Sequence, residues 1–378
     1  MRLLFICGGS PATVFALAPL ATAARQAGHG VVVAATEDMV PVVTGAGLPA
    51  IATTPLSMRD LMFRDRAGQP LALPQDPQER LLFGGRGFGR LAAAGMPALA
   101  ALTAVWRPDV VVGGTLAFAA GLLATDLAVP YVRHAWDLGE PAEMDLGAAA
   151  ELEAELAARE LAGLPEADLW IHLSPPSLLP PEAPPGRVMR YVPAGRQQRL
   201  ESWMLAAPGD RPRVCVTAGS RAESGPELDD LLRLTGEVAR TGAEVLVAAA
   251  DAAAAALTAA HPGVRAGWLP LDTVLPTCDA IVHAGGGQTA LTAIHAGVPQ
   301  VLVPSMPKLL PHARRLAEAG AAMNLPAGED GPGAVEAACT AILTQDKFRA
   351  RSRELAAEMA ALPGPAEVIG EIAGLRRR

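Results

Sequence analysis

The chain has 378 residues, enough for about two domains. Hydrophobic residues make up 51% of it and charged residues 19%, a composition that allows a large apolar core. The net charge of −8 argues against a nucleic-acid partner, and the four scattered cysteines, which form no CxxC pair, argue against a zinc site or a disulfide framework.

Short apolar runs alternate with helical segments through the N-terminal half of the chain. RLLFICGG, residues 2–9, indicates a buried parallel strand, and residues 14–29 indicate a helix. DVVVGGTLAFAAGLLATDLAVP, residues 109–130, is too short for a membrane span and is interrupted by Asp126, so it indicates a strand and a helix. With further strands expected at 31–36, 48–53 and 129–136, the pattern predicts a doubly wound α/β sheet in a cytoplasmic protein without a membrane span.

The alternating pattern breaks between residues 55 and 90. This segment mixes charged residues with glycine and proline. A loop of that length inside a compact domain is usually functional or disordered. Two interpretations stay open here: a lid or acceptor-binding loop, and a mobile surface loop.

The α/β pattern starts again after a proline-rich connector, SPPSLLPPEAPPG, at residues 174–186. Strands are expected at 212–220, 244–250 and 279–286, with a helix at 228–240. We therefore predict an N-terminal domain at 1–207, a C-terminal domain at 208–362, and a last helix, 363–378, that returns to the N-terminal domain. Two facing domains of this kind would bind ligands in a cleft at the carboxyl ends of their strands.

Three consecutive glycines stand where a strand passes into a helix. The stretch is CDAIVHAGGGQTALTAIHAGVPQVLVP, residues 278–304. A turn made of Gly285, Gly286 and Gly287 leaves the first N–H groups of the helix uncovered, and such a helix start attracts anions. The pattern indicates a phosphate site; the alternative is a tight turn whose glycines only permit unusual backbone angles.

Residues 267–304, which begin GWLPLDTVLPTCDAIVHAGGG, resemble the donor-binding segment of family 1 glycosyltransferases with the GT-B fold. The N-terminal segment 10–50 looks like bacterial enzymes that attach deoxysugars to aromatic polyketides, above all the glycosyltransferases of urdamycin and landomycin (angucycline) biosynthesis. The resemblance covers essentially the whole chain. It implies a nucleotide sugar bound by the C-terminal domain and an acceptor bound by the N-terminal one.

The resemblance also implies a set of donor-binding residues. His283 matches the histidine that contacts the donor diphosphate, and Gly285, Gly286, Gly287 and Thr289 match the turn and helix start that hold it. The remaining implied donor-binding residues are Ser220 and Arg221 near the phosphates, Trp268 and Leu269 beside the nucleobase, and Lys308 near the sugar.

Three positions depart from the family pattern. Ala284 replaces a second histidine, and Lys308 and Leu309 replace an acidic residue and a glutamine that hold sugar hydroxyls in many relatives. Because an unpaired buried polar group is costly, this replacement favours a sugar with few hydroxyls. Thr13 stands where many relatives have a catalytic histidine, so the usual base is missing.

The stretch YVRHAWDLGEP, residues 131–141, offers a substitute for that base. A matching aspartate faces the acceptor in the angucycline subgroup, so we assign Asp137 as the base or acceptor-orienting group; the alternative is an ordinary loop or helix-capping aspartate. The other expected acceptor-binding residues are Ser10, Thr13, Phe83, His134 and Trp136.

These residues together predict an inverting glycosyltransferase. It would move a 2,6-dideoxyhexose such as olivose from a dTDP-sugar to an angucycline-like aromatic polyketide, without a metal or other cofactor, and form a C-glycoside. O-glycosylation of a similar acceptor, a sugar-nucleotide 2-epimerase and an inactive partner of a true transferase are the alternatives. The sequence leaves a homodimer open.

Overall fold

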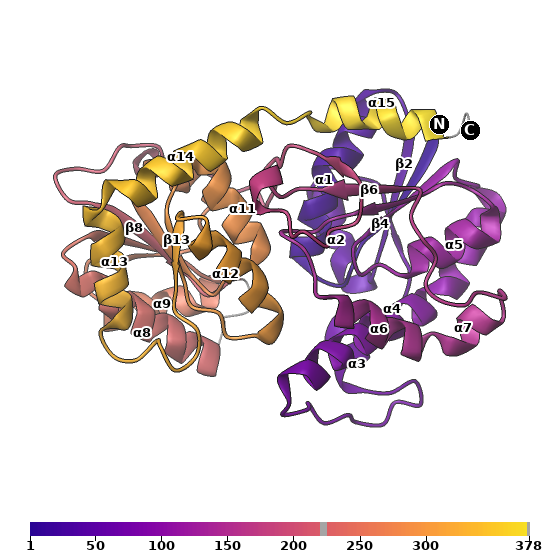
Figure 1. The fold of residues 1–378 in the computed structure, drawn as a ribbon, viewed down its shortest axis with the longest axis horizontal. Helices are drawn as coiled ribbons and strands as arrows, with labels where there is room; N and C mark the ends of the chain where they lie inside the picture. The colour runs from indigo at the N-terminus through magenta and orange to yellow at the C-terminus, as the bar shows by residue number, and fades with distance from the viewer. Residues whose placement is uncertain (220–224, 376–378) are drawn as a thin grey trace. The chain divides into compact units, whose positions relative to one another are not determined.

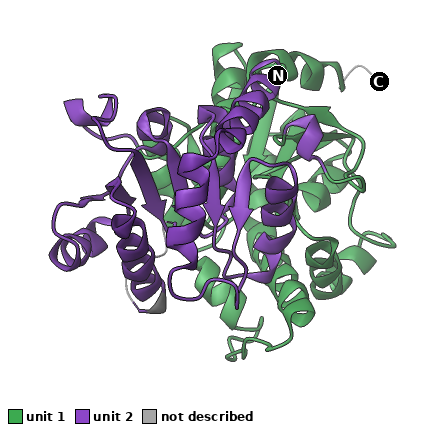
Figure 2. Cartoon of the chain, turned by 60° about the vertical axis from the view of Figure 1, so that its left-hand side comes forward, with its two compact units in different colours: residues 1–174, 180–196, 362–378 green, residues 175–179, 197–361 purple. Residues whose placement is uncertain are grey.

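The computed structural model describes residues 1–219 and 225–375. The chain divides into two compact units, coloured separately in Figure 2. Unit 1 comprises Met1–Ser174, Pro180–Arg196 and Leu362–Arg378, and unit 2 comprises Pro175–Leu179 and Gln197–Ala361. Residues 197–207, assigned to the first domain from the sequence, thus belong to unit 2.

Unit 1 is built on a seven-stranded parallel sheet with the strand order β3-β2-β1-β4-β5-β6-β7. The strand order reverses between β1 and β4, and the carboxyl ends of these two strands are where such sheets bind ligands. The strands are β1 Arg2–Ile6, β2 Gly30–Ala35, β3 Ala50–Ala52, β4 Val110–Gly114, β5 Tyr131–His134, β6 Leu169–His172 and β7 Arg187–Val188.

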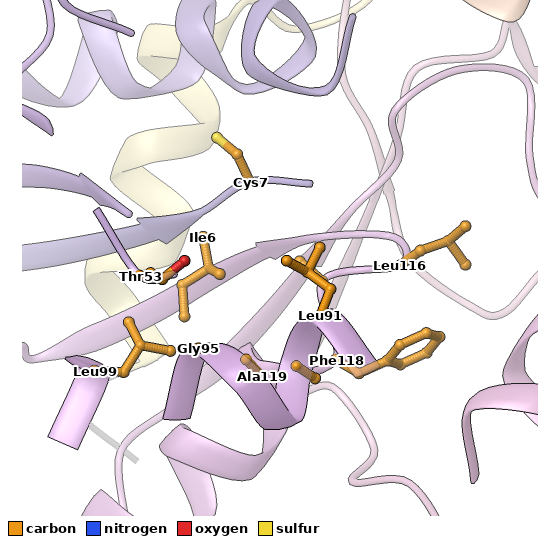
Figure 3. Close-up of a pocket in the computed structure, with 11 residues that line it drawn as sticks. Ile6, Cys7, Thr53, Leu91, Gly95, Leu99, Leu116, Phe118 and Ala119 are labelled. Carbon is orange, nitrogen blue, oxygen red and sulfur yellow. The ribbon is translucent and has the colours of Figure 1, made fainter. Parts of the chain in front are cut away.

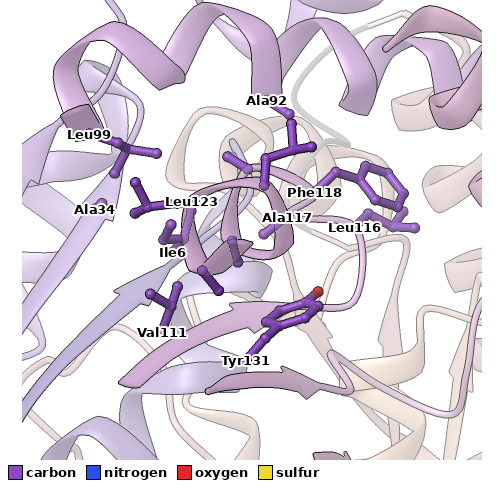
Figure 4. Packing of buried hydrophobic residues seen from close by; sticks show 14 of the residues in the cluster. Ile6, Ala34, Ala92, Leu99, Val111, Leu116, Ala117, Phe118, Leu123 and Tyr131 are labelled. Carbon is purple, nitrogen blue, oxygen red and sulfur yellow. The ribbon is translucent and has the colours of Figure 1, made fainter. Parts of the chain in front are cut away.

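Helices surround this sheet, as Figure 1 shows. Leu4 and Ile6 of β1 and Val111 of β4 pack with residues of α4 and α5 in one apolar cluster, part of which is drawn in Figure 4. The helices of unit 1 are α1 Pro11–Gln26, α2 Val40–Gly45, α3 Met58–Phe63, α4 Pro77–Val105, α5 Ala119–Leu127, α6 Ala142–Glu151, α7 Glu153–Ala157 and α15 Pro365–Leu375, with a short 3-10 helix η1 at Glu37–Met39.

The prediction of a long loop between residues 55 and 90 is wrong for most of that segment. Its two ends are helical, in α3 and α4, and only residues 64–76 lie between these helices. The glycines that suggested a loop instead allow α4 to pack closely on α6. A Cβ on Gly85 would lie 2.1 Å from the carbonyl oxygen of Met144, and one on Gly147 would lie 2.1 Å from that of Leu82. These glycines let two helix backbones touch.

By length and composition alone, α4 could cross a membrane, and it is the one helix among the described residues that meets this test. Its buried residues include Leu91, Ala92 and Leu99. All three lie against unit 1's own core or its small internal cavity. The helix therefore has a structural place within unit 1. The apolar run at residues 109–130 forms β4 and α5, as expected.

Unit 2 has a six-stranded parallel sheet with the order β10-β9-β8-β11-β12-β13. Here the strand order reverses between β8 and β11. The strands are β8 Arg213–Thr217, β9 Glu244–Ala248, β10 Arg265–Gly267, β11 Ala280–His283, β12 Gln300–Leu302 and β13 Ala322–Asn324. The helices are α8 Pro226–Arg240, α9 Asp251–Ala260, α10 Leu271–Val274, α11 Gly287–Ala296, α12 Leu310–Glu318, α13 Ala334–Thr344 and α14 Asp346–Ala360, with 3-10 helices η2 Pro176–Leu178, η3 Ser202–Met204, η4 Leu275–Thr277 and η5 Pro307–Leu309.

The last helix, α15, belongs to unit 1, where it packs against α1. Its apolar face buries Val368, Ile369 and Ile372. Two polar contacts secure the same segment: the N–H of Arg190 donates to the carbonyl of Pro363 (2.8 Å), and Arg187 pairs with Glu371 (2.9 Å). The chain thus completes unit 1 only with its final residues.

Candidate functional site

The glycine turn of unit 2 lies at the reversal point of its sheet. Strand β11 ends at His283, which pairs in register with Thr217 at the end of the neighbouring strand β8. Gly285 adopts a φ of +80°, a conformation that side-chain-bearing residues rarely adopt. Gly286 then serves as the N-cap of α11 and offers no side chain to cover the helix start. The first N–H groups of α11 consequently face the end of the sheet where ligands bind.

His283 is fully buried beneath this turn, and both of its ring nitrogens have partners within the protein. Nδ1 accepts the N–H of Gly285 (3.2 Å), so the ring proton sits on Nε2, which donates to Oε1 of Gln300 (2.9 Å). Burial is the main cause that lowers the pKa of His283 to about 4; the hydrogen bond to Gln300 opposes this shift and nearby His312 adds to it, so the ring is neutral at pH 7. Neither nitrogen is left to donate to a phosphate. The expected direct contact is replaced by support of the turn.

His312 holds the same turn from the other side. Its Nε2 donates to the carbonyl oxygen of Gly285 at 2.8 Å, and the side chain is buried. Sequence reasoning assigned neither His312 nor Gln300 a role at this turn. One signal for Gln300 was available: it is a polar residue at the start of an otherwise apolar strand.

The other predicted donor-binding residues have different surroundings. Thr289 occupies the third position of α11, and Lys308 lies half-buried in η5. Leu269 is a core residue, 7% exposed, and packs with Leu246 and Ile281. Ser220 and Arg221 lie outside the described residues.

Trp268 precedes Leu269 and is half-buried. Its backbone carbonyl accepts a hydrogen bond from the side-chain amide of Gln198. This hydrogen bond anchors the backbone of the segment that carries the indole ring.

At the reversal point of unit 1, Trp136 fills the space between the ends of β1 and β4. A Cβ on Gly114 would lie 1.6 Å from the indole Nε1, and one on Gly8 would lie 2.8 Å from the ring. The same added Cβ on Gly8 would lie 3.1 Å from Cγ2 of Thr13. The hydroxyl of Thr13 donates to the carbonyl of Ser10 (2.7 Å). The structure thus brings together Trp136, Thr13 and the first loop. The Thr13 hydroxyl is engaged with the Ser10 carbonyl in the first turn of its own helix.

Asp137 follows directly and is half-buried. Its Oδ1 accepts the N–H of Gly139 at 3.1 Å, which shapes the loop after β5. Both ends of this loop are fixed: Arg133, at the end of β5, makes a two-pronged ion pair with Asp145 of α6 at 2.8 and 2.6 Å. The carboxylate of Asp137 is therefore presented on a loop with anchored ends.

His134 does not fit its expected role as an acceptor-binding residue. Its side chain is 0% exposed, and its Nδ1 donates to the carbonyl of Ala135 at 2.6 Å. Burial lowers its pKa to about 4. His134 is therefore a buried structural residue at the end of β5.

The aromatic residues of α4 lie near these loops. Phe88 packs on Trp136 with ring centroids 5.6 Å apart, and Phe83 packs on the exposed Phe63 at 6.0 Å. A cavity of only about 10 Å³ lies between α4 and the sheet, where Figure 3 shows its apolar lining with Thr53 at one side. That volume is no more than about one water molecule needs, so this cavity is no polyketide site. Among the described residues, no three or more His, Cys, Asp or Glu side chains are grouped to hold a metal ion.

Comparison with known proteins identifies the family. Residues 82–219 match the N-terminal domain, and residues 232–375 the C-terminal domain, of the family described as erythromycin biosynthesis protein CIII-like (EryCIII-like). The chain is 37% identical to the L-demethylnoviosyl transferase of Streptomyces niveus, over 96% of this chain and 95% of that one. The chain belongs to the EryCIII-like glycosyltransferases. A further relative is the elloramycin glycosyltransferase ElmGT of Streptomyces olivaceus, 30% identical over 98% of this chain and 97% of that one.

Solved structures of similar enzymes agree with this assignment. The glycosyltransferase SsfS6 of Streptomyces sp. SF2575, in complex with thymidine diphosphate, superposes with a TM-score of 0.88 at 37% identity, covering 99% of each chain. The spinosyn rhamnosyltransferase SpnG with thymidine diphosphate gives 0.86 at 27% identity, covering 99% of this chain and all of that one. The predicted GT-B class, with two Rossmann-like parallel-sheet domains, is confirmed. The chain is a deoxysugar glycosyltransferase of antibiotic biosynthesis.

Proposed function

We propose that this EryCIII-like enzyme transfers a 2,6-dideoxyhexose from a dTDP-sugar to an aromatic polyketide of the angucycline type, with inversion at the anomeric carbon. The observation that carries the proposal is the turn Gly285–Gly287 at the reversal point of unit 2, directly before α11. The relatives SsfS6 and SpnG have been solved with thymidine diphosphate, which fits a diphosphate at such a turn.

The leaving diphosphate gains charge as its bond to the sugar breaks. The N–H groups at the start of α11, together with the helix dipole, are oriented to stabilise that charge before the reaction begins. No metal ion is needed for this step in the proposed mechanism, because the backbone supplies the positive end of the dipole.

Apolar residues border Gly285 in the turn, which supports a sugar with few hydroxyls. Leu309 is 4% exposed, and a Cβ added to Gly285 would lie 3.6 Å from the Cβ of Leu309. Pro304 borders Gly285 in the same way at 3.5 Å. A sugar hydroxyl placed against these groups would lose its water without gaining a partner.

Asp137 is the proposed base for the acceptor in unit 1. A phenol ionises easily by losing its proton to water, and its phenolate has a nucleophilic ortho carbon. That carbon attacks the anomeric carbon, the bond from the sugar to the diphosphate breaks, and the ortho proton passes to Asp137 as the ring regains aromaticity. A C–C bond results. If the phenol oxygen attacks instead, Asp137 takes its proton as the C–O bond forms and the bond from the sugar to the diphosphate breaks, and the product is an O-glycoside.

One assay tests the function. The purified protein is incubated with an angucyclinone and an equimolar mixture of a dTDP-2,6-dideoxyhexose and dTDP-glucose, and the products are read by mass. We expect the mass gain of the dideoxy sugar to dominate. Preferred transfer of glucose would overturn the assignment of the donor, and no product with either donor would overturn the assignment of the substrates.

Hot dilute acid then separates the two linkages. An O-glycoside of a deoxysugar is cleaved under these conditions, whereas a C-glycoside has no bridging oxygen to protonate. We expect the sugar to stay attached. Its release would show that the enzyme forms an O-glycoside.

A further inference from the structure

Two buried side chains that do not face the ligand side of unit 2 fix the shape of its glycine turn. Gln300 opens β12 and is 1% exposed, and His312 lies in α12 at 3%. They reach the turn from different elements: Gln300 contacts His283, and His312 contacts Gly285 directly. Each contact is made at a specific polar atom of the turn or of the residue that precedes it.

His312 controls the direction of one backbone N–H group. Its Nε2 donates to the carbonyl oxygen of Gly285 at 2.8 Å. The peptide group is planar and trans, so the N–H of Gly286 points opposite to that carbonyl. Holding the carbonyl towards α12 therefore aims the N–H of Gly286 away from α12. Because a φ of +80° leaves Gly285 with backbone freedom, this peptide would otherwise be easy to rotate.

Gln300 controls the other half of the turn through His283. Its Oε1 accepts the Nε2–H of His283 at 2.9 Å, while its Nε2 lies 3.4 Å from the carbonyl of Ala290 in α11. An amide in this position keeps the imidazole neutral, with its proton on Nε2. Only then can Nδ1 accept the N–H of Gly285 (3.2 Å).

We propose that Gln300 and His312 are positioning residues that pre-orient the glycine turn for the donor diphosphate, through His283 and through the Gly285 carbonyl respectively. The inference rests on the proposed function, since it takes the diphosphate as the ligand of the turn. Neither residue is a catalytic residue, because each acts through another group.

The first test compares two substitutions of His312 by their affinity for thymidine diphosphate, measured by calorimetry. His312→Leu removes the donor to Gly285 and should weaken binding about tenfold, the order expected when one orienting hydrogen bond is lost. His312→Gln keeps an N–H donor and should recover most of the affinity. Ile342→Ala, in the buried core of unit 2 away from the turn, controls for lost stability: it should lower the unfolding temperature while binding stays unchanged.

The second test uses pH. In Gln300→Glu a carboxylate faces His283 and favours its protonation, after which Nδ1 can no longer accept from Gly285. Among the residues that the structure describes, His312 is the other titratable group that acts on His283. The ratio of the variant's Kd for thymidine diphosphate to that of the wild type should therefore fall as the pH is raised from about 6 to 9. A purely structural defect would leave this ratio constant with pH.

The outcomes separate the two proposals. If the wild type does not bind thymidine diphosphate, the proposed donor site is wrong. If the wild type binds it and His312→Leu binds equally well, or His312→Gln binds as weakly as the leucine variant, the positioning role of His312 is wrong while the donor site stands. A constant Kd ratio for Gln300→Glu overturns the role of Gln300 in the same way.

Discussion

The carboxylate of Asp137 has a defined orientation because Oδ1 accepts the N–H of Gly139 at 3.1 Å. An asparagine side chain carries the same oxygen and can keep that hydrogen bond. Substitution by asparagine therefore separates the shape of the loop from the basicity of the carboxylate. This makes the residue suited to a clean test.

We expect Asp137→Asn to lower kcat/KM by about 10²–10⁴-fold, the range typical of general acid–base catalysis. Affinity for thymidine diphosphate, whose proposed site is in unit 2, should change little. Steady-state kinetics and calorimetry measure the two quantities. Full activity of the variant would show that Asp137 only shapes the loop.

Two buried histidines make stability depend on pH. Burial lowers the pKa of His134 and of His283 from 6.5 to about 4. Between these values the unfolded chain binds protons that the folded chain does not, so acid favours unfolding. The stabilisation is present above pH 6.5 and is lost as the pH falls towards 4.

We expect the free energy of unfolding to fall between pH 6.5 and 4.5, by up to about 1.4 kcal/mol per pH unit for each histidine. Denaturant unfolding at several pH values measures the slope. His134→Asn retains a donor for the Ala135 carbonyl but does not titrate, so its slope should be shallower. An unchanged slope would mean that His134 does not contribute.

Single residues show where sequence reasoning reaches the site and where it stops. The glycine turn and His283 could be found because they stand together in one motif of known type. The contacts of Gln300 and His312 could not be predicted, because they join residues 17 and 27 positions apart in sequence. The direction of the His283 ring was also out of reach, because it depends on those same partners.

Among the elements, α4 contains glycines in two different packing environments. Gly85 lies where α4 touches the backbone of α6, and an added Cβ would meet the Met144 carbonyl oxygen at 2.1 Å. Gly95 lies ten positions further on, beside the small cavity, and its nearest neighbour would be Cβ of Thr53 at 3.4 Å. Gly85 therefore has no room for a side chain, whereas Gly95 has room for a methyl group.

Gly85→Ala and Gly95→Ala should therefore shift stability in opposite directions. The first forces α4 and α6 apart and should cost about 1–3 kcal/mol, as overpacking does. The second removes a helix-weakening glycine and fills space, which should add up to about 1 kcal/mol. Thermal unfolding of the two variants beside the wild type gives the sign. Equal shifts would contradict the close packing of α4 on α6.

The same helix explains the main error in the predicted elements. The segment GGRGFGR, residues 84–90, has the composition of a loop, yet it is helical because tertiary packing requires small residues there. Strongly apolar strands such as β1 and β4 were predictable, because burial on both faces dictates their composition. Close helix contacts leave no such local signature.

For the whole molecule, the proposed mechanism assigns the leaving-group charge to backbone dipoles. Turnover should accordingly persist in excess EDTA, measured as product formed with a dTDP-deoxysugar and an aromatic polyketide. Loss of activity that Mg²⁺ or Mn²⁺ restores would mean that a metal ion shares this charge.

The course of the chain between its two units bears on how hybrid enzymes can be made from this family. Unit 1 takes its final helix, α15, from the end of the sequence, and α15 packs on α1. A hybrid joined at one point near residue 196 would therefore combine residues 1–196 of one parent with α15 of the other. The α15 of the second parent would then have to pack against the α1 of the first. A second junction near residue 362 restores the native pair. If unit 2 binds the donor, as proposed, exchanging donor specificity between relatives requires replacing residues 197–361 as an internal segment rather than joining two halves at one point.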